Sequence, residues 1–216
     1  MLNHRIIDMK HLNNKRIEFL VDIISSTPKT YLYALRYLDR FKLGRIQSLQ
    51  IEKEMFCFMA FIVRKNIQPM GECYEMNNTI ERSKELAVKK FVKGKWIRHK
   101  SFLGYCNQRV EYWSSFDHIA TPQGEGGMLY SFSQNIAGII TGNKYDKLFL
   151  LLYSDFLEMY QKIQTLILAG WDNPDSFVEK NYQYKSRTNA FSWEKAIIIT
   201  LLAIALVIIV LELLTH

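Results

Sequence analysis

Residues 145–168, "YDKLFLLLYSDFLEMYQKIQTLIL", show the clearest helical pattern in this chain of 216 residues. Apolar side chains recur there at intervals of three and four: Phe149, Leu152, Phe156, Met159, Ile163 and Leu166. This spacing places them on one face of an α-helix of about five turns. Because an apolar face of that length has to pack against other helices, the stretch predicts a helical bundle.

The segment 49–65, "LQIEKEMFCFMAFIVRK", shows the same spacing. Its predicted core face holds Met55, Phe58, Met59 and Ile62, broadened by Cys57 and Phe61. Pro69 and Gly71 are expected to end that region.

Three more helices are predicted around these two. In 25–41, "SSTPKTYLYALRYLDRF", Ser26 or Thr27 is the expected N-cap and Pro28 the first helical residue. A third apolar helix is expected to begin at Met128 and to bury Leu129, Phe132, Ile136 and Ile139, and a shorter one at Asn173–Pro174. Residues 66–121 read as short helical stretches mixed with charged and aromatic loop. Since period-2 alternation is scarce, the predicted fold class is all-α.

The C-terminal segment is predicted to span a membrane. Ala196–Leu214 is 19 residues long, and Thr200 and Glu212 are its only polar members. A helix of that length extends about 28 Å, close to the hydrocarbon thickness of a bilayer. Glu212 falls near the far end, where its carboxylate can reach the headgroups.

The flanking residues predict the orientation of this anchor. Trp193 and Lys195 are expected at the near interface, and the basic residues before them favour a cytoplasmic location for 1–195. The N-terminal stretch carries charges throughout, so no signal peptide is expected. The predicted layout is an all-helical cytoplasmic domain over 1–190, an interfacial linker over 191–195 and a transmembrane anchor over 196–214.

The formal charge of +7 is concentrated in one stretch. Arg82–Lys100, "RSKELAVKKFVKGKWIRHK", holds eight Lys or Arg residues against one Glu, with Phe91 and Trp96 between them. Such a stretch fits anionic membrane lipids or a nucleic acid. The predicted anchor favours lipids over nucleic acid, and a plain solvated surface remains an equal alternative. The three cysteines are widely spaced, which predicts a reducing compartment and no disulfide framework.

Two groups contain residue types that carry chemistry. Asp117-His118 next to Ser114 and Ser115 resembles an acid–base–nucleophile set, but triad partners normally come from separate elements. A metal site formed by His99, Cys106 and His118 has no recognised ligand spacing. We therefore expect no catalytic residue and no metal site.

The glycines before Met128 predict a tight turn. Gly124, Gly126 and Gly127 tolerate positive φ and close backbone approach. Phosphate binding at the following helix N-terminus is physically possible. Since the Lys and the Ser or Thr of a nucleotide loop are missing, no cofactor is expected.

The order of these features resembles the DotU/TssL family, the tail-anchored inner-membrane component of type VI and type IVB secretion systems. Three stretches carry the resemblance, and they cover about a fifth of the chain. They are Ala60–Ile62; Trp113 to Gly126-Gly127 with Tyr130 and Phe132; and Leu157–Tyr160 with Leu166 and Gly170. The chain departs from the family where Val63-Arg64-Lys65 replace an acidic pair and Met128 replaces a Glu, so it resembles a divergent member.

The resemblance implies a structural role without catalysis. It implies pairing with an IcmF/TssM-type membrane protein, contact with secretion baseplate components and a possible homodimer, at the bacterial inner membrane. The expected partner-binding residues are Trp113, Gly126, Gly127 and Tyr130. Two alternatives come from other classes: a tail-anchored enzyme or nucleotide sensor using Asp117, His118 and the glycine turn, and a membrane-tethered nucleic-acid-binding protein using Arg82–Lys100.

Overall fold

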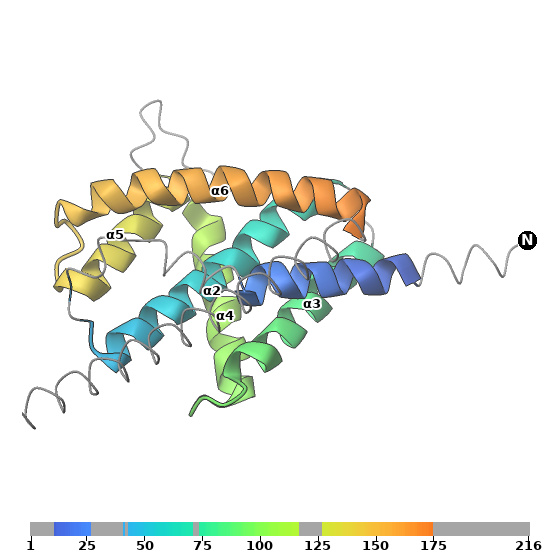
Figure 1. Cartoon of the computed structure of the whole chain (residues 1–216), viewed down its shortest axis with the longest axis horizontal. Coiled ribbons are helices and arrows are strands. Elements are labelled where there is room, and N and C mark those ends of the chain that lie inside the picture. The colour runs from blue at the N-terminus through green and yellow to red at the C-terminus, as the bar shows by residue number, and fades with distance from the viewer. Residues whose placement is uncertain (1–10, 27–40, 42, 71–73, 117–126, 175–216) are drawn as a thin grey trace, which may run out of the picture. The chain divides into compact units, whose positions relative to one another are not determined.

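The computed structural model describes residues 11–26, 41, 43–70, 74–116 and 127–174 (Figure 1). Every regular element in these ranges is a helix, which confirms the all-α prediction. The chain divides into two compact units, Met1–Pro174 and Asp175–His216, and all described residues belong to the first.

Residues 11–26 form the first described helix. The elements that follow are α2 (Arg45–Ile67), the short 3-10 helix η2 (Gln68–Met70), α3 (Tyr74–Val92), α4 (His99–Phe116), α5 (Met128–Thr141) and α6 (Leu148–Asp172). Pro174 is again helical after a break at Asn173, where the sequence predicts a new helix to begin.

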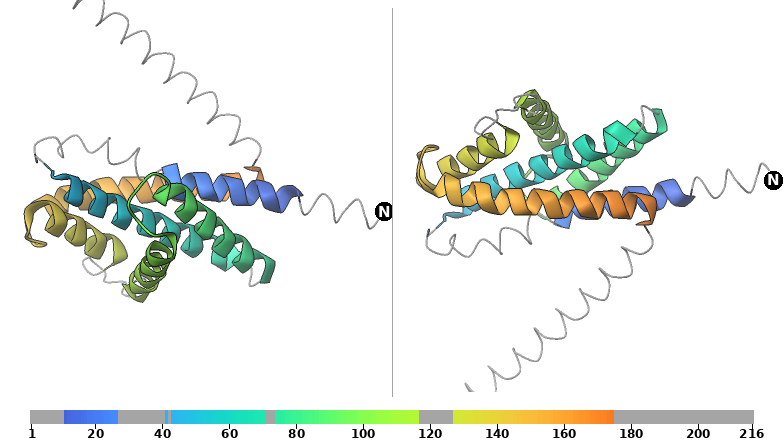
Figure 2. Two further views of the ribbon diagram at one scale, coloured as in Figure 1. Left: turned by 90° about the horizontal axis from the view of Figure 1, so that it is seen from below. Right: turned by 90° about the horizontal axis from the view of Figure 1, so that it is seen from above.

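Helix α2 is the centre of this unit. It contacts α3, α4, α5 and α6, and the two views of Figure 2 show these helices on its different sides. Residues 54–63 are all buried, without interruption. A helix that is covered on all sides has no need of a polar face, which explains the continuous apolar run around Phe58.

An aromatic cluster fills the space between α2, α4, α5 and α6. The Phe58 ring stacks on Phe132 with a centroid separation of 3.9 Å and an interplanar angle of 6°. Trp113 contacts both rings edge-on, at 5.7 Å from Phe58 and 5.4 Å from Phe132. Phe156 of α6 lies 4.8 Å from Phe132. All four side chains are buried, so the predicted core face of residues 49–65 meets the predicted α5 and α6 faces here.

The predicted core face of α6 is right in the middle and wrong at both ends. Leu152, Phe156, Met159 and Ile163 are buried as predicted. At the first end, Leu148 is buried in place of the predicted Phe149. At the second end, Ile167 is buried in place of the predicted Leu166, which is 41% exposed. A helix has 3.6 residues per turn, and a step of four from Ile163 stays on the buried side, whereas a step of three turns outward. In α5 Ile140 is buried instead of Ile139, for the same reason.

The helix over residues 11–26 packs on the end of α6. The Arg16 guanidinium lies over the Trp171 ring, 4.4 Å from its centroid, and its Nε donates to the Trp171 carbonyl at 2.9 Å. A Cβ at Gly170 would clash with the buried Phe19 ring, so this close approach requires glycine. Ser26 is itself helical here, which contradicts its prediction as the N-cap of a later helix; residues 27–40 lie outside the described residues.

Residues 74–116 differ from their prediction of short helices mixed with loop. They form two long helices, α3 with 19 residues and α4 with 18. The buried face of α3 is interrupted by Thr79, Ser83 and Lys84, so its apolar spacing is weak in the sequence. Polar partners in the folded protein compensate: the Thr79 hydroxyl bonds Asn13 Oδ1 at 2.6 Å, and Lys84 pairs with Glu81 at 2.5 Å.

Among the described helices, none has the length and apolar character needed to cross a membrane. The predicted anchor over 196–214, the linker over 191–195 and their residues Trp193, Lys195 and Glu212 lie outside the described residues, as does the predicted domain boundary at residue 190.

Candidate functional site

The most organised polar group in the described part of the chain surrounds Glu54 of α2. Glu54 is buried, and its Oε2 accepts from Arg109 Nε at 2.9 Å and from Arg109 Nη2 at 2.6 Å. The Tyr105 hydroxyl donates to the other carboxylate oxygen, Oε1. Both donors come from α4, so one acid on α2 fixes the position of two consecutive turns of α4.

The surroundings of this cluster close it off. The Arg109 guanidinium lies 4.5 Å from the ring centroids of both Tyr112 and Trp113. Burial, followed by the hydrogen bond to Glu54, raises the pKa of Tyr105. The Glu54 carboxylate has its partners on both oxygens, which is what a buried charge requires. The arrangement holds α2 against α4.

Two buried thiols lie beside the cluster. Cys57 of α2 and Cys106 of α4 are both free and buried, and their side chains are within hydrogen-bonding contact. Burial and the contact with Cys106 raise the pKa of the Cys57 thiol. A thiol in this environment stays protonated and unreactive, so the pair serves as packing between α2 and α4.

The predicted partner-binding residues that the structure describes differ in their exposure. Trp113 is completely buried in the aromatic cluster, so no face of its ring is open to a partner. Tyr130 is half-buried, with its ring 5.1 Å from Phe149 and 6.3 Å from Tyr153. Gly127 caps α5 with an extended backbone at φ −74°, so positive φ is not why glycine stands there. Gly126 lies outside the described residues.

The residues of the enzyme alternative are only partly described. Asp117, His118, Gly124 and Gly126 lie outside the described residues. Ser114 and Ser115 donate their hydroxyls to the α4 backbone, at 2.9 Å to Val110 O and 2.7 Å to Tyr112 O.

The proposed metal ligands on α4 are far apart. His99 and Cys106 are separated by seven residues of α4, a rise of about 10 Å. No group of three metal-ligating side chains occurs within the part of the chain that the structure describes.

A polar pocket of about 350 Å³ lies between α2, α3 and α4. Its charged lining residues are Arg64, Glu111, Lys84 and Glu81. They pair with one another, Arg64 with Glu111 at 2.6 Å and Lys84 with Glu81 at 2.5 Å. Arg64 stands where the DotU/TssL pattern has an acid, and here it ties the end of α2 to α4.

Helix α6 exposes leucines near both of its ends. Leu150 and Leu151 are 59% and 58% exposed in the first turn of the helix. Leu166 and Leu168 are 41% and 40% exposed near the other end. Sequence reasoning missed the first group, although the run Leu150-Leu151-Leu152 contains the signal: neighbouring side chains on a helix point about 100° apart, so three in a row cannot all face a core on one side. We call Leu150 and Leu151 the α6 apolar patch.

The basic stretch Arg82–Lys100 forms the second half of α3, the turn after it and the start of α4. Lys84 is buried, Lys90 pairs with Asp22 at 2.7 Å, and Lys95 pairs with Glu52 at 2.5 Å. Trp96 at the turn is fully exposed. The stretch therefore combines structural ion pairs with an exposed remainder.

Comparisons with protein-family models, with curated proteins and with solved structures found no match to this chain.

Proposed function

We propose that the chain is a structural scaffold subunit of a bacterial secretion-system membrane complex of the type VI kind, without catalytic activity. In this proposal residues 196–214 anchor it in the inner membrane, and residues 1–190 face the cytoplasm. The cytoplasmic domain pairs with an IcmF/TssM-type membrane protein and links it to the baseplate.

The positions of the family-like residues support this proposal. Ile62, Trp113, Phe132 and Met159 come from four different helices and are all buried. Phe132 contacts Trp113 directly, at a ring separation of 5.4 Å. The short stretches that resemble the DotU/TssL family thus supply parts of one shared core, which is what inherited fold-determining motifs would do.

One observation carries the proposed partner contact: the α6 apolar patch. Large apolar side chains exposed together on the surface of a helix are typical of protein–protein interfaces. The other side of α6 is anchored through Leu152 and Phe156, so the patch is presented on a fixed support. We assign it to the contact with the IcmF/TssM-type protein.

The test compares two pairs of exposed leucines on the same helix. Full-length chain, purified in mild detergent from membranes of the organism that encodes it, is expected to retain a large multi-span membrane protein. The variant Leu150→Ser/Leu151→Ser should lose that protein, whereas Leu166→Ser/Leu168→Ser, which also removes two exposed leucines, should retain it. Mass spectrometry of the eluates gives the readout.

The outcomes distinguish a wrong contact surface from a wrong function. Retention by both variants would contradict the α6 apolar patch as the contact. Recovery of the unsubstituted chain without any membrane protein would contradict the scaffold role itself. A thermal melt of each variant checks that the fold survives, and little change is expected because the substituted side chains are exposed.

A further inference from the structure

The turn between α3 and α4 places Trp96 in solvent. Gly94 has a φ of 77°, in the left-handed region that favours glycine, and it lets the chain reverse just after α3. The Lys95 Nζ lies 2.5 Å from Glu52 Oε2 of α2 and 3.6 Å from the centroid of the Phe91 ring of α3. Trp96, the next residue, is fully exposed.

The charge around this turn has one sign. No acidic residue occurs between Glu85 and Glu111. Of the basic residues there, Lys90, Lys95 and Arg109 pair with acids of other helices. The remainder are exposed and have no acidic partner among the described residues: Lys89, Lys93, Arg98 and Lys100. We call residues 93–100 the basic tip.

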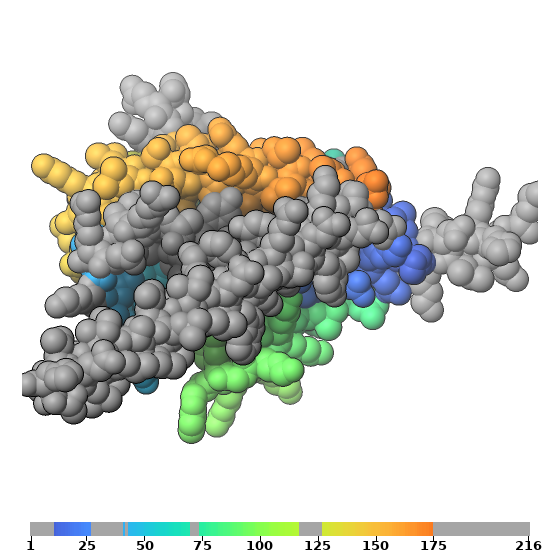
Figure 3. Space-filling model, in the orientation of Figure 1, coloured from blue at the N-terminus to red at the C-terminus, as the bar shows by residue number. Residues whose placement is uncertain are grey.

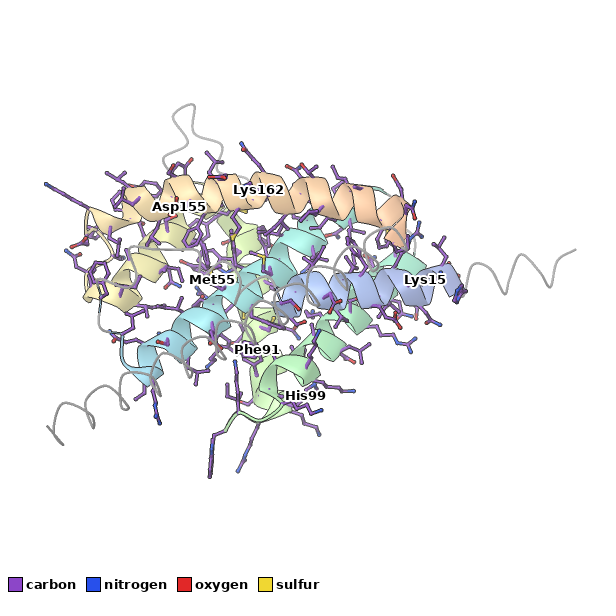
Figure 4. The ribbon with its side chains drawn as sticks, in the orientation of Figure 1. Lys15, Met55, Phe91, His99, Asp155 and Lys162 are labelled. Atoms are coloured by element: carbon purple, nitrogen blue, oxygen red, sulfur yellow. The ribbon has the colours of Figure 1, made fainter. Side chains whose placement is uncertain are left out.

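The basic tip projects from the rest of the described helices. Figure 3 shows it as a green protrusion at the lower edge, away from α6. In Figure 4, the labelled His99 marks the same end of α4, with long side chains reaching outward beside it. A protruding tip can touch a flat surface without a clash of the bundle behind it.

We propose that the basic tip docks on the surface of an anionic lipid bilayer, with the Trp96 ring in the headgroup region. An indole ring is amphipathic and prefers this interface, which explains how a fully exposed tryptophan is of use to the protein. Lysine and arginine near an anionic bilayer each strengthen binding roughly fivefold. This inference does not depend on the scaffold role, although its test uses the proposed anchor over 196–214 to hold the chain in a bilayer.

The shape of the tip favours lipid over nucleic acid. Binding of a single strand normally uses a positively charged groove that follows the backbone and several aromatic rings on which successive bases stack. The tip offers one exposed ring on a convex turn, because Phe91 and Phe102 are buried and stack on each other at 4.8 Å. A planar array of anionic headgroups matches one ring surrounded by cations better than an extended strand does.

The experiment follows the exposure of Trp96 in the full-length chain. The chain is reconstituted into bilayer discs of phosphatidylcholine alone or with phosphatidylglycerol, and hydroxyl-radical oxidation of each aromatic residue is measured by mass spectrometry. Trp96 should be oxidised several-fold less in the anionic discs. Tyr74, which is 84% exposed at the other end of α3, should be oxidised equally in both and is the internal reference.

Matched charge variants test the cause. Lys93→Gln/Arg98→Gln should weaken docking roughly 30-fold and restore the oxidation of Trp96 in anionic discs. Lys144→Gln/Lys147→Gln, which removes two exposed charges between α5 and α6, should leave Trp96 protected. All four side chains are exposed, so both variants are expected to fold.

Three results would overturn the proposal. The first is equal oxidation of Trp96 in the two kinds of disc. The second is protection by a single-stranded oligonucleotide at low salt without protection in anionic discs, which would assign the tip to nucleic acid. The third is protection of Trp96 in anionic discs that Lys93→Gln/Arg98→Gln and Lys144→Gln/Lys147→Gln abolish equally. That result would show a general effect of protein charge and would contradict a specific role of the basic tip.

Discussion

The two pairs of helices that pack on α2 are held to it in different ways. Helices α5 and α6 meet it mainly through apolar side chains such as Phe132 and Phe156, with one part-buried hydrogen bond from Gln47 Nε2 of α2 to Ile139 O of α5 at 3.2 Å. Helix α4 adds ion pairs to its apolar contacts with α2, the buried Glu54 with Arg109 and the more exposed Arg64 with Glu111. The buried Lys84 of α3 pairs within its own helix, with Glu81. One side is an apolar core and the other combines apolar packing with a charged network.

The difference teaches where function can reside. The apolar interface uses only the buried side of α6. The opposite side of the helix can therefore carry exposed leucines that contact a partner. A network of ion pairs fixes each charge that it uses, and the charges left over gather at the basic tip. We therefore assign protein contact to α6 and membrane contact to the turn after α3.

The largest loss of stability is expected from Phe132→Ala, which tests the apolar side of this comparison. Removing this ring leaves a cavity beside Phe58 and Trp113, and we expect the free energy of unfolding to fall by about 3–5 kcal/mol. Urea denaturation followed by circular dichroism measures the loss. Phe149→Ala is the control: its ring is only half-buried, and the loss should be clearly smaller. Equal losses would show that the aromatic cluster is not the centre of the core.

The charged side is tested by Glu54→Ala. This change leaves Arg109 without its acid, and since the Arg109 side chain is 18% exposed and can reach water, we expect a loss of about 2–3 kcal/mol. The control is Glu52→Ala, which removes the more exposed pair with Lys95 and should cost at most about 1 kcal/mol. Suppose that urea denaturation shows no greater loss in the free energy of unfolding for Glu54→Ala than for Glu52→Ala. The charged network then does not hold α4 against α2.

The contact of residues 11–26 with α6 is tested by Gly170→Ala. A methyl group there meets the buried Phe19 ring, so we expect a loss of about 1–3 kcal/mol from overpacking. Gly104→Ala in α4 is the matched control, because a Cβ at Gly104 has nothing within 4 Å, and alanine should stabilise that helix by up to about 1 kcal/mol. A change of the same sign at both positions, measured by thermal unfolding, would contradict the close approach.

The smallest expected effect concerns pH. The pKa of Tyr105 is raised in the folded protein, so the folded state keeps this proton after the unfolded chain begins to lose it. The resulting stabilisation is complete below about pH 10, the usual pKa of tyrosine, and falls as pH rises beyond it. Tyr105→Phe should remove this part of the alkaline loss in stability, whereas Tyr145→Phe, at an exposed position, should not. Identical pH profiles for the two variants would rule the Glu54–Tyr105 bond out as its source.

The sequence predicted the apolar side of α2 better than the charged side. Met55, Phe58 and Phe132 sit where their spacing places them, because apolar periodicity reports directly on burial. Thr79, Ser83 and Lys84 hide the buried face of α3, since each is polar in the sequence, and bonds within α3 to Glu75 O, Thr79 O and Glu81 allow them to be buried. The helix over 11–26 was not predicted, although Ile17, Leu20 and Ile24 recur at intervals of three and four and are buried.

The candidate surfaces were harder to predict than the fold. Tryptophan is common in binding sites, but Trp113 lies in the core. A pattern of residue types does not distinguish a buried ring from an exposed one. Trp96 is the opposite case: its exposure depends on Gly94 and on the Lys95–Glu52 pair, and the second of these joins residues 43 positions apart. A single sequence gives no access to such a contact.

The most direct test of the scaffold role is the mass of the particle that the full-length chain forms when it is extracted from its native membranes in mild detergent. The account predicts a complex far heavier than one chain of 25.5 kDa, with an IcmF/TssM-type protein among its members. A single chain in the extract, or a chain that is found in the supernatant before any detergent is added, would contradict it.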